Sequence, residues 1–201
     1  MKKKRLPFVP QLTEIDCVPA TFLNALNKLF TRGEIPAIVI QRIYQDCLDL
    51  PNNKGTSTAA VQCLGIWLSQ YRDPKMKAFK VGTEFCIGEE VHFNRRSKIT
   101  RRLTSGGVAL LQLWDRDGDL HYVLVLSADN DWVHCFDPYY EWEPRMSKQG
   151  GYEFIQNPSF HGHNLKINRA WLDGYSEGGG YRLGHNKDRE CLLMWRKRPA
   201  Q

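Results

Sequence analysis

The sequence has 201 residues, of which 42% are hydrophobic and 25% charged, and its formal net charge is +6. This composition is typical of a globular chain long enough for one domain with a sizeable core, and it excludes a disordered or collagen-like protein. The positive charge permits acidic partners without identifying one. No stretch approaches the ~18 consecutive apolar residues of a membrane-spanning helix.

The cysteines and the first residues indicate a cytoplasmic protein. Because no Cys-x-x-Cys pair occurs, we expect reduced thiols rather than a disulfide framework. The basic start, MKKKR, is followed by two prolines and Gln11 before the apolar segment of a signal peptide can form. The six cysteines are widely spaced: Cys17, Cys47, Cys63, Cys86, Cys135 and Cys191.

A helix is expected to open at Cys17. Asp16 or Cys17 can serve as its N-cap, Pro19 suits the first turn, and Gly33 is expected to end the helix. Because the unpaired N–H groups at a helix start lower the pKa of a thiol there, Cys17 is the candidate nucleophile. The alternative is that Cys17 is a small buried hydrophobic residue, as most unpaired cysteines are.

The next elements are two helices and a strand. Apolar spacing predicts a helix over 35–50 and another over 57–71, the latter with Thr56 or Ser57 as its N-cap. Alternation after Asp73-Pro74 predicts a strand over 75–82. We therefore expect a helical part that ends near residue 72.

A basic helix is expected over 94–104, with Ile99 and Leu103 directed inward. Its charge permits contact with an acidic segment or a phosphate backbone, but charge runs are usually solvated faces. No nucleic-acid motif accompanies it, so nucleic acid is not the expected partner. The basic residues are Arg95, Arg96, Lys98, Arg101 and Arg102.

The remaining chain is predicted to be mainly β. Three antiparallel strands joined by Asp/Gly/Asn turns are expected over 107–114, 120–127 and 132–140, and a final strand over 190–196. A helical turn is expected over 171–175.

Two of these strands carry candidate partners for Cys17. A hairpin loop of three or four residues places His121 opposite Asp137 or one residue from it, on the same face of the sheet. An imidazole oriented by a carboxylate is what a cysteine nucleophile needs as its base. Gln11, one loop before Cys17, is the candidate side-chain donor to an oxyanion.

Two blocks carry a family resemblance. LPFVPQLTEIDCVPATFLNAL and HYVLVLSADNDWVHCFDPYY resemble the bacteriocin-processing, double-glycine leader peptidases, which are papain-like. The resemblance implies an α+β papain-like fold, with N-terminal helices packed on an antiparallel sheet, in a single domain over 1–201. Its helical part is expected at about 1–72 and its sheet part at about 73–201.

The same resemblance implies roles for the site residues. Cys17 is expected to be the nucleophile, His121 the general base and acid, Asp137 the orienting carboxylate and Gln11 the oxyanion donor. The implied activity is hydrolysis of a peptide or isopeptide bond in a peptide or protein substrate, without a cofactor or metal. Val18 stands where the family usually has glycine.

Other functions remain open at this point. The same triad can transfer the acyl group to an amine, or the fold can be a non-catalytic peptide or nucleic-acid binding module. A zinc site is a weaker alternative because its candidates lack the usual ligand spacing; these are His134, Cys135, His161 and His163. Aromatic residues that follow Asp137 can line a cleft or belong to the core; they are Tyr139, Tyr140 and Trp142.

Overall fold

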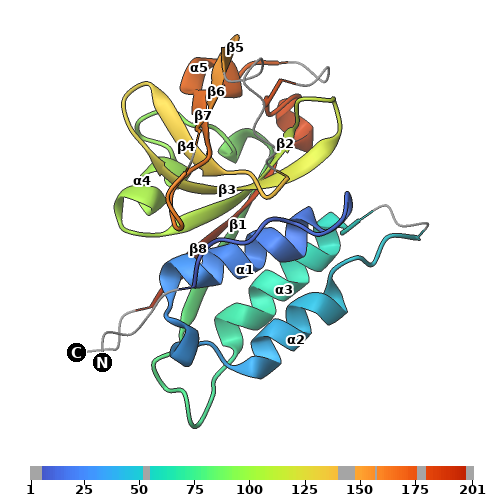
Figure 1. Cartoon of the computed structure of the whole chain (residues 1–201), viewed down its shortest axis with the longest axis vertical. Helices are drawn as coiled ribbons and strands as arrows, with labels where there is room; N and C mark the ends of the chain where they lie inside the picture. Colours follow the sequence, from blue (N-terminus) through green and yellow to red (C-terminus); the bar gives the residue numbers. More distant parts are fainter. Residues whose placement is uncertain (1–5, 52–54, 140–147, 157, 176–179, 198–201) are drawn as a thin grey trace.

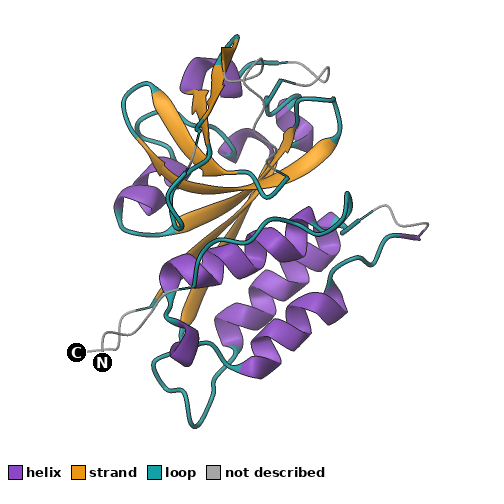
Figure 2. Ribbon diagram, viewed as in Figure 1, coloured by secondary structure: helices purple, strands orange, loops and turns teal. Residues whose placement is uncertain are grey.

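The protein consists of a layer of helices packed against an antiparallel sheet, so the α+β class is confirmed (Figures 1 and 2). No helix in the part of the chain that the structure describes is long and apolar enough to cross a membrane. The computed structural model describes residues 6–51, 55–139, 148–156, 158–175 and 180–197.

Three helices precede the sheet in the described residues, as predicted: α1 (Cys17–Leu29), α2 (Ala37–Asp46) and α3 (Thr58–Gln70). The helix α2 is shorter than the predicted 35–50, because Cys47 adopts an extended conformation. The helix α1 does begin at Cys17, with Asp16 in the N-cap position. Ser57 caps α3, since its side chain accepts a hydrogen bond from the Ala60 N–H at 3.1 Å.

The predicted end of α1 at Gly33 is wrong. The helix stops at Leu29 because Phe30 adopts an extended conformation, with φ −131° and ψ 162°. Gly33 lies instead in a short 3₁₀ helix, η1 (Arg32–Glu34). The Glu34 carboxylate accepts a hydrogen bond from the Thr31 N–H at 2.9 Å, so side-chain capping fixes this turn.

Within the described ranges, the sheet has eight strands in the order β1-β8-β2-β3-β4-β7-β6-β5, and every neighbouring pair is antiparallel. The three predicted central strands and the final strand are present. The bounds are β1 Val81–Ile87, β2 Val108–Trp114, β3 Leu120–Ala128, β4 Trp132–Phe136, β5 Lys148–Gln149, β6 Tyr152–Phe154, β7 Leu165–Asn168 and β8 Glu190–Arg196.

The strand expected over 75–82 is largely absent. The Asp73 carboxylate accepts hydrogen bonds from the N–H groups of Lys75 and Met76, and the Phe79 N–H returns to the Met76 carbonyl. These bonds hold the segment in turns, because an Asp side chain competes with ladder pairing for nearby N–H groups. The strand β1 therefore begins only at Val81.

The central strands are buried on both faces, which explains their nearly continuous apolar sequences. On one face, Leu110 and Leu124 pack with α1, α2 and α3. On the other, Leu111 and Val123 pack with the curled strands β4, β6 and β7 and with the short helix α4 (Lys98–Thr104). The helical layer and the curled sheet thus form two cores that share the same strands (Figure 1).

Two short helices complete the fold. The predicted basic helix is α4, which begins at Lys98 rather than at residue 94 and directs Ile99 and Leu103 inward as expected. The helical turn expected over 171–175 is α5 (Arg169–Leu172), two residues earlier, where Asn168 accepts hydrogen bonds from the first N–H groups.

Part of the charge on α4 is used within the protein. The Lys98 ammonium lies 3.0 Å from carboxylate oxygens of both Glu84 and Glu90. The Arg102 guanidinium stacks 3.7 Å from the centre of the Trp195 ring. These contacts reduce the charge available to an acidic partner, in keeping with a solvated face.

Candidate functional site

His121 and Asp137 form a buried contact where strand β3 begins and strand β4 ends. The Nε2 atom of His121 lies 2.8 Å from Oδ1 of Asp137, and the two side chains are only 7% and 2% exposed. The predicted register was wrong: the ladder ends with Leu124 paired to Phe136, and counting on from that pair places Asp137 across from Val123 rather than from His121. A β-bulge between Val125 and Ser127 shifts the pairing. His121 therefore reaches Asp137 along the diagonal of the sheet, still from the same face.

Asp137 is held by groups that the sequence did not reveal. The Tyr181 hydroxyl donates to its Oδ2 at 2.6 Å, and the Tyr139 N–H donates to its Oδ1 at 2.9 Å. The buried Asn164 side chain accepts from the Asp137 N–H at 2.7 Å and donates to its carbonyl at 2.8 Å. Tyr181 and Asn164 come from loops far along the chain, where no motif spacing marks them.

Tyr181 itself has an unusual backbone. Its φ of +59° lies in the left-handed region, which costs a residue other than glycine free energy of folding. The two backbone hydrogen bonds between Trp114 and Arg182 secure the neighbouring residue, and the Tyr152 ring packs against Tyr181 with centroids 4.9 Å apart. The surrounding structure thus holds a strained residue in the position where its hydroxyl meets Asp137.

Cys17 belongs to the core beneath the helices and lies close enough to the same histidine to raise its pKa. It is the first residue of α1 and 9% exposed. The helix is joined to strand β3 by a 3.2 Å hydrogen bond from the Thr21 hydroxyl to the Tyr122 carbonyl. Since His121 uses Nε2 for Asp137, its Nδ1 atom is the ring nitrogen left for the thiol.

The charges of the site favour a protonated imidazole. Burial alone lowers the pKa of His121, but the Asp137 carboxylate raises it through charge and a hydrogen bond, and Cys17 raises it further. The net direction is upward. Burial likewise raises the pKa of Asp137, but the charge of His121 and hydrogen bonds from His121, Tyr181 and Tyr139 outweigh it, so this pKa is lowered.

The N-terminal segment brings Gln11 to the site. The Asn24 side chain exchanges two hydrogen bonds with the Val9 backbone, and the Gln11 N–H donates to the Pro138 carbonyl at 3.0 Å. The Gln11 amide, however, donates from Nε2 to the Thr13 carbonyl at 2.7 Å, and its buried Oε1 has no hydrogen-bond partner in the described part of the chain. Only the second Nε2 hydrogen remains for an oxyanion, so that role stays a prediction.

The start of α1 is not capped by a side chain. The Asp16 carboxylate turns back to accept hydrogen bonds from the N–H groups of Leu12 and Thr13, at 3.0 and 2.7 Å, and makes none to the helix. The Cys17 N–H therefore has no side-chain cap, and it remains available to a ligand at the helix N-terminus.

A groove of about 640 Å³ adjoins Cys17. It is bounded by the residues around the start of α1, the segment 55–58, and the facing ends of β2 and β3. Val18, which is almost fully buried, lines it too. The full set is Glu14, Ile15, Cys17, Val18, Leu50, Gly55, Thr56, Ser57, Thr58, Gln112, Asp119, Leu120 and Tyr122.

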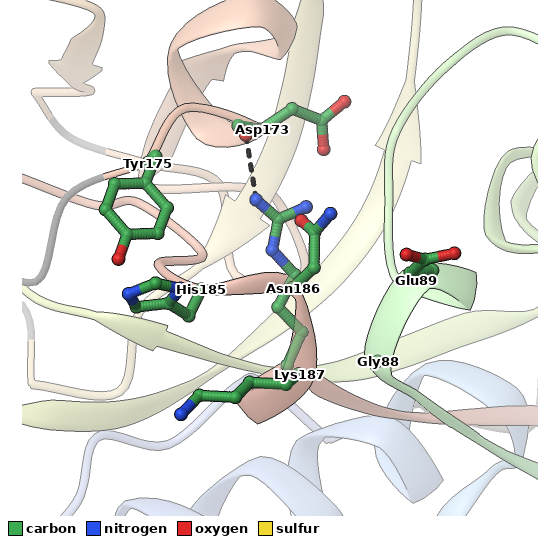
Figure 3. Close-up of a pocket in the computed structure, with 8 residues that line it drawn as sticks. Gly88, Glu89, Asp173, Tyr175, His185, Asn186 and Lys187 are labelled. Carbon is green, nitrogen blue, oxygen red and sulfur yellow. Dashed lines mark hydrogen bonds between the residues drawn. The ribbon is translucent and has the colours of Figure 1, made fainter.

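A second cavity, of about 550 Å³, is lined by residues on either side of the turn at Asn186 (Figure 3). The rings of Tyr175 and His185 meet edge to face, with centroids 3.9 Å apart. The Arg189 guanidinium donates to the carbonyl of Asp173 at 2.9 Å, and to those of Gly184 and Val91. These bonds use Arg189 to join loops, which is a structural role.

The zinc alternative gains no support from the geometry. His134 and His163 do lie together, with ring centroids 4.6 Å apart, but Cys135 belongs to the core on the other face and His161 meets the Leu6 carbonyl. Within the described ranges, no three His, Cys, Asp or Glu side chains are grouped to hold a metal ion.

The aromatic residues after Asp137 are only partly described. Tyr139 is 43% exposed and is not a core residue, whereas Tyr140 and Trp142 lie outside the described residues.

No protein-family model matches the chain, and the search of curated proteins found no match. The function must therefore be argued from the site itself.

Proposed function

We propose that the chain is a cysteine hydrolase of the papain-like type, related to the bacteriocin-processing peptidases, that cleaves a peptide or isopeptide bond. One observation carries the proposal: a buried histidine lies 2.8 Å from Asp137 through Nε2, and Asp137 and Cys17, the first residue of α1, both raise its pKa against the effect of burial. A nucleophile, a base and an orienting carboxylate in that order are what thioester chemistry requires.

In the first half of the reaction, the Cys17 sulfur attacks the carbonyl carbon and forms a C–S bond. His121 holds the proton that came from the thiol and transfers it to the leaving nitrogen as the C–N bond breaks. Asp137 keeps the imidazolium oriented through the 2.8 Å contact. The products are a thioester on Cys17 and a free amine.

In the second half, His121 takes a proton from water as the water oxygen attacks the thioester carbon. The C–S bond breaks, the carboxylic acid leaves, and the proton returns to Cys17. An amine in place of water gives acyl transfer by the same steps. The Cys17 N–H and the second Nε2 hydrogen of Gln11 are the proposed oxyanion donors, and loss of one such donor typically costs about 10²–10³ in rate.

The test is the pH dependence of Cys17 alkylation by iodoacetamide, followed by peptide mass spectrometry. We expect rapid alkylation below pH 7 in the wild type and a rate lower by at least about 10² in His121→Ala, since thiolate formation depends on the imidazole. His134→Ala is the matched control, because that histidine also contacts an aspartate but lies apart from Cys17.

Cys63 gives an internal reference in every sample, since it is an exposed free cysteine. A Cys17 that reacts no faster than Cys63, with the same pH profile in His121→Ala, contradicts the hydrolase proposal. That outcome favours the non-catalytic binding module on the same fold.

A further inference from the structure

We infer that the groove beside Cys17 binds a cationic side chain of the substrate, of the lysine or arginine type. This inference rests on the proposed function, because it assigns a substrate class to the same site. It depends on the charges, an unpartnered hydroxyl and the apolar wall of the groove.

The first observation is the charge of the groove. Glu14 and Asp119 both line it, one from the loop before α1 and the other from the residue before β3, and both are exposed. Neither carboxylate has a hydrogen bond or ion pair within the described residues, and no described Lys, Arg or His lines the groove. Two unpaired carboxylates at one groove, in a chain of net charge +6, complement a cation.

The second observation is a buried hydroxyl that lacks a partner. Tyr122 lines the same groove and is only 4% exposed, yet its Oη makes no hydrogen bond in the described structure. Because buried polar groups are normally paired, an orphan beside a groove indicates a bond that a ligand completes. A substrate amide or carbonyl group lying along the groove can form it.

The third observation is the apolar surface between these groups. Leu120 is 56% exposed and lines the groove together with Val18 and Leu50. A lysine or arginine side chain has a hydrocarbon stem that packs on such a surface while its charged end stays near a carboxylate. An acidic side chain gains the same apolar contact but is repelled by Glu14 and Asp119.

The experiment compares charged thiosulfonates at Cys17. The 2-aminoethyl and 2-sulfonatoethyl methanethiosulfonates each form a mixed disulfide with a thiolate and release methanesulfinate, but they carry opposite charges. The ratio of their rates at Cys17 is measured by quenched peptide mass spectrometry in the wild type, in Glu14→Gln, in Asp119→Asn and in the double variant. Glu89→Gln, which changes the second cavity, is the matched control.

We expect the cation-to-anion ratio at Cys17 to fall about tenfold in the double variant, and by less in each single variant, because two charges near the sulfur are removed. The ratio at Cys63, and both ratios in Glu89→Gln, should stay at the wild-type values. A Cys17 ratio within twofold of wild type in the double variant overturns the inference.

The neutral methyl methanethiosulfonate separates this inference from the function it rests on. The hydrolase proposal stands if this reagent reacts faster at Cys17 than at Cys63 and more slowly at Cys17 in His121→Ala. If, in addition, the cation-to-anion rate ratio at Cys17 does not change in the Glu14 and Asp119 variants, the inference fails. If this reagent reacts no faster at Cys17 than at Cys63, both fail.

Discussion

The β3–β4 hairpin carries two histidine–aspartate pairs with the same contact distance. His121 and Asp137 lie 2.8 Å apart at one end, and His134 and Asp129 lie 2.8 Å apart at the other. The first pair is 7% and 2% exposed, whereas the second is 18% and 55% exposed. The distance alone therefore does not distinguish a candidate catalytic pair from a surface contact.

The difference lies in what else each aspartate does. Asp129 accepts hydrogen bonds from the N–H groups of Asp131 and Trp132, so it closes the hairpin turn. The hydrogen bond from His134 and these backbone bonds lower the pKa of Asp129. Asp137, in contrast, is enclosed with an ion-pairing histidine whose pKa is raised, against the effect of burial, by Asp137 and by Cys17. The His121–Asp137 pair thus differs from the His134–Asp129 pair in its burial and in the effect of Cys17 on its histidine.

The largest expected difference between the pairs is in stability. Asp137→Ala should lower the free energy of unfolding by about 3–5 kcal/mol, because it leaves a buried imidazolium unpaired and removes the acceptor for Tyr181. Asp129→Ala should cost about 1 kcal/mol, since the pair is exposed and water replaces its contacts. Urea unfolding at pH 7 measures both. Equal losses would contradict the contrast.

Tyr181→Phe should have the next largest effect. It removes the 2.6 Å hydrogen bond to Asp137 and leaves a buried carboxylate oxygen short of a donor, at a cost of about 1–3 kcal/mol. Tyr139→Phe is the matched control, because Tyr139 donates to Asp137 through its backbone N–H, which phenylalanine keeps. The same urea titration applies. The prediction is contradicted if only Tyr139→Phe lowers the free energy of unfolding.

The pH dependence of stability sharpens the comparison. The pKa of His121 is raised on folding, so its contribution is complete below about pH 6.5 and declines as pH rises toward the folded-state pKa. The pKa of Asp137 is lowered, so its contribution is present above about pH 4 and is lost only in acid.

In Cys17→Ser, which removes the titration of the thiol itself, the free energy of unfolding should therefore fall between pH 6.5 and 8.5, by at most about 1.4 kcal/mol per unit. Adding His121→Gln should flatten this decline, while adding His134→Gln should leave it in place. Thermal or urea unfolding across this range measures the slopes. A decline that survives His121→Gln assigns the titration to another group.

The smallest expected effect is at Tyr122. Because its hydroxyl has no hydrogen-bond partner among the described residues, Tyr122→Phe should change the free energy of unfolding by less than about 0.5 kcal/mol, or increase it. The contrast with Tyr181→Phe compares two buried tyrosines, one bonded and one not. A loss above 1 kcal/mol, on the order of a hydrogen bond, would show that the Tyr122 hydroxyl has a structural partner.

The sequence predicted those parts of the fold that depend on local pattern. Cys17 does open α1 and Ser57 does cap α3, because capping and apolar spacing act within one or two turns. A short hairpin loop correctly predicted that His121 and Asp137 share one face of the sheet, but it did not predict their register, because a β-bulge between Val125 and Ser127 shifts the pairing. The papain-like fold itself stays a proposal.

The remaining features depend on contacts between distant segments. Tyr181 and Asn164 reach Asp137 from loops, and no periodicity indicates this. The end of α1 was misplaced because Phe30 leaves the helix in an extended conformation. The start of β1 was misplaced because the Asp73 side chain bonds the following backbone into turns, which overrides local propensity. Nor does any sequence motif indicate the hydrogen bond from the Gln11 side chain to the Thr13 carbonyl.

The most direct test of the central claim is the protonation state of His121 at pH 7, measured by nitrogen-15 NMR of histidine-labelled protein. Assignment uses His121→Gln, and His134 provides the comparison within the same spectrum. Because Asp137 and Cys17 both raise its pKa against the effect of burial, His121 should have both ring nitrogens protonated, and its pKa should be lower in Cys17→Ser than in the wild type. A neutral His121 ring at pH 7, unchanged in Cys17→Ser, would contradict the thiolate–imidazolium pair and with it the proposed enzyme.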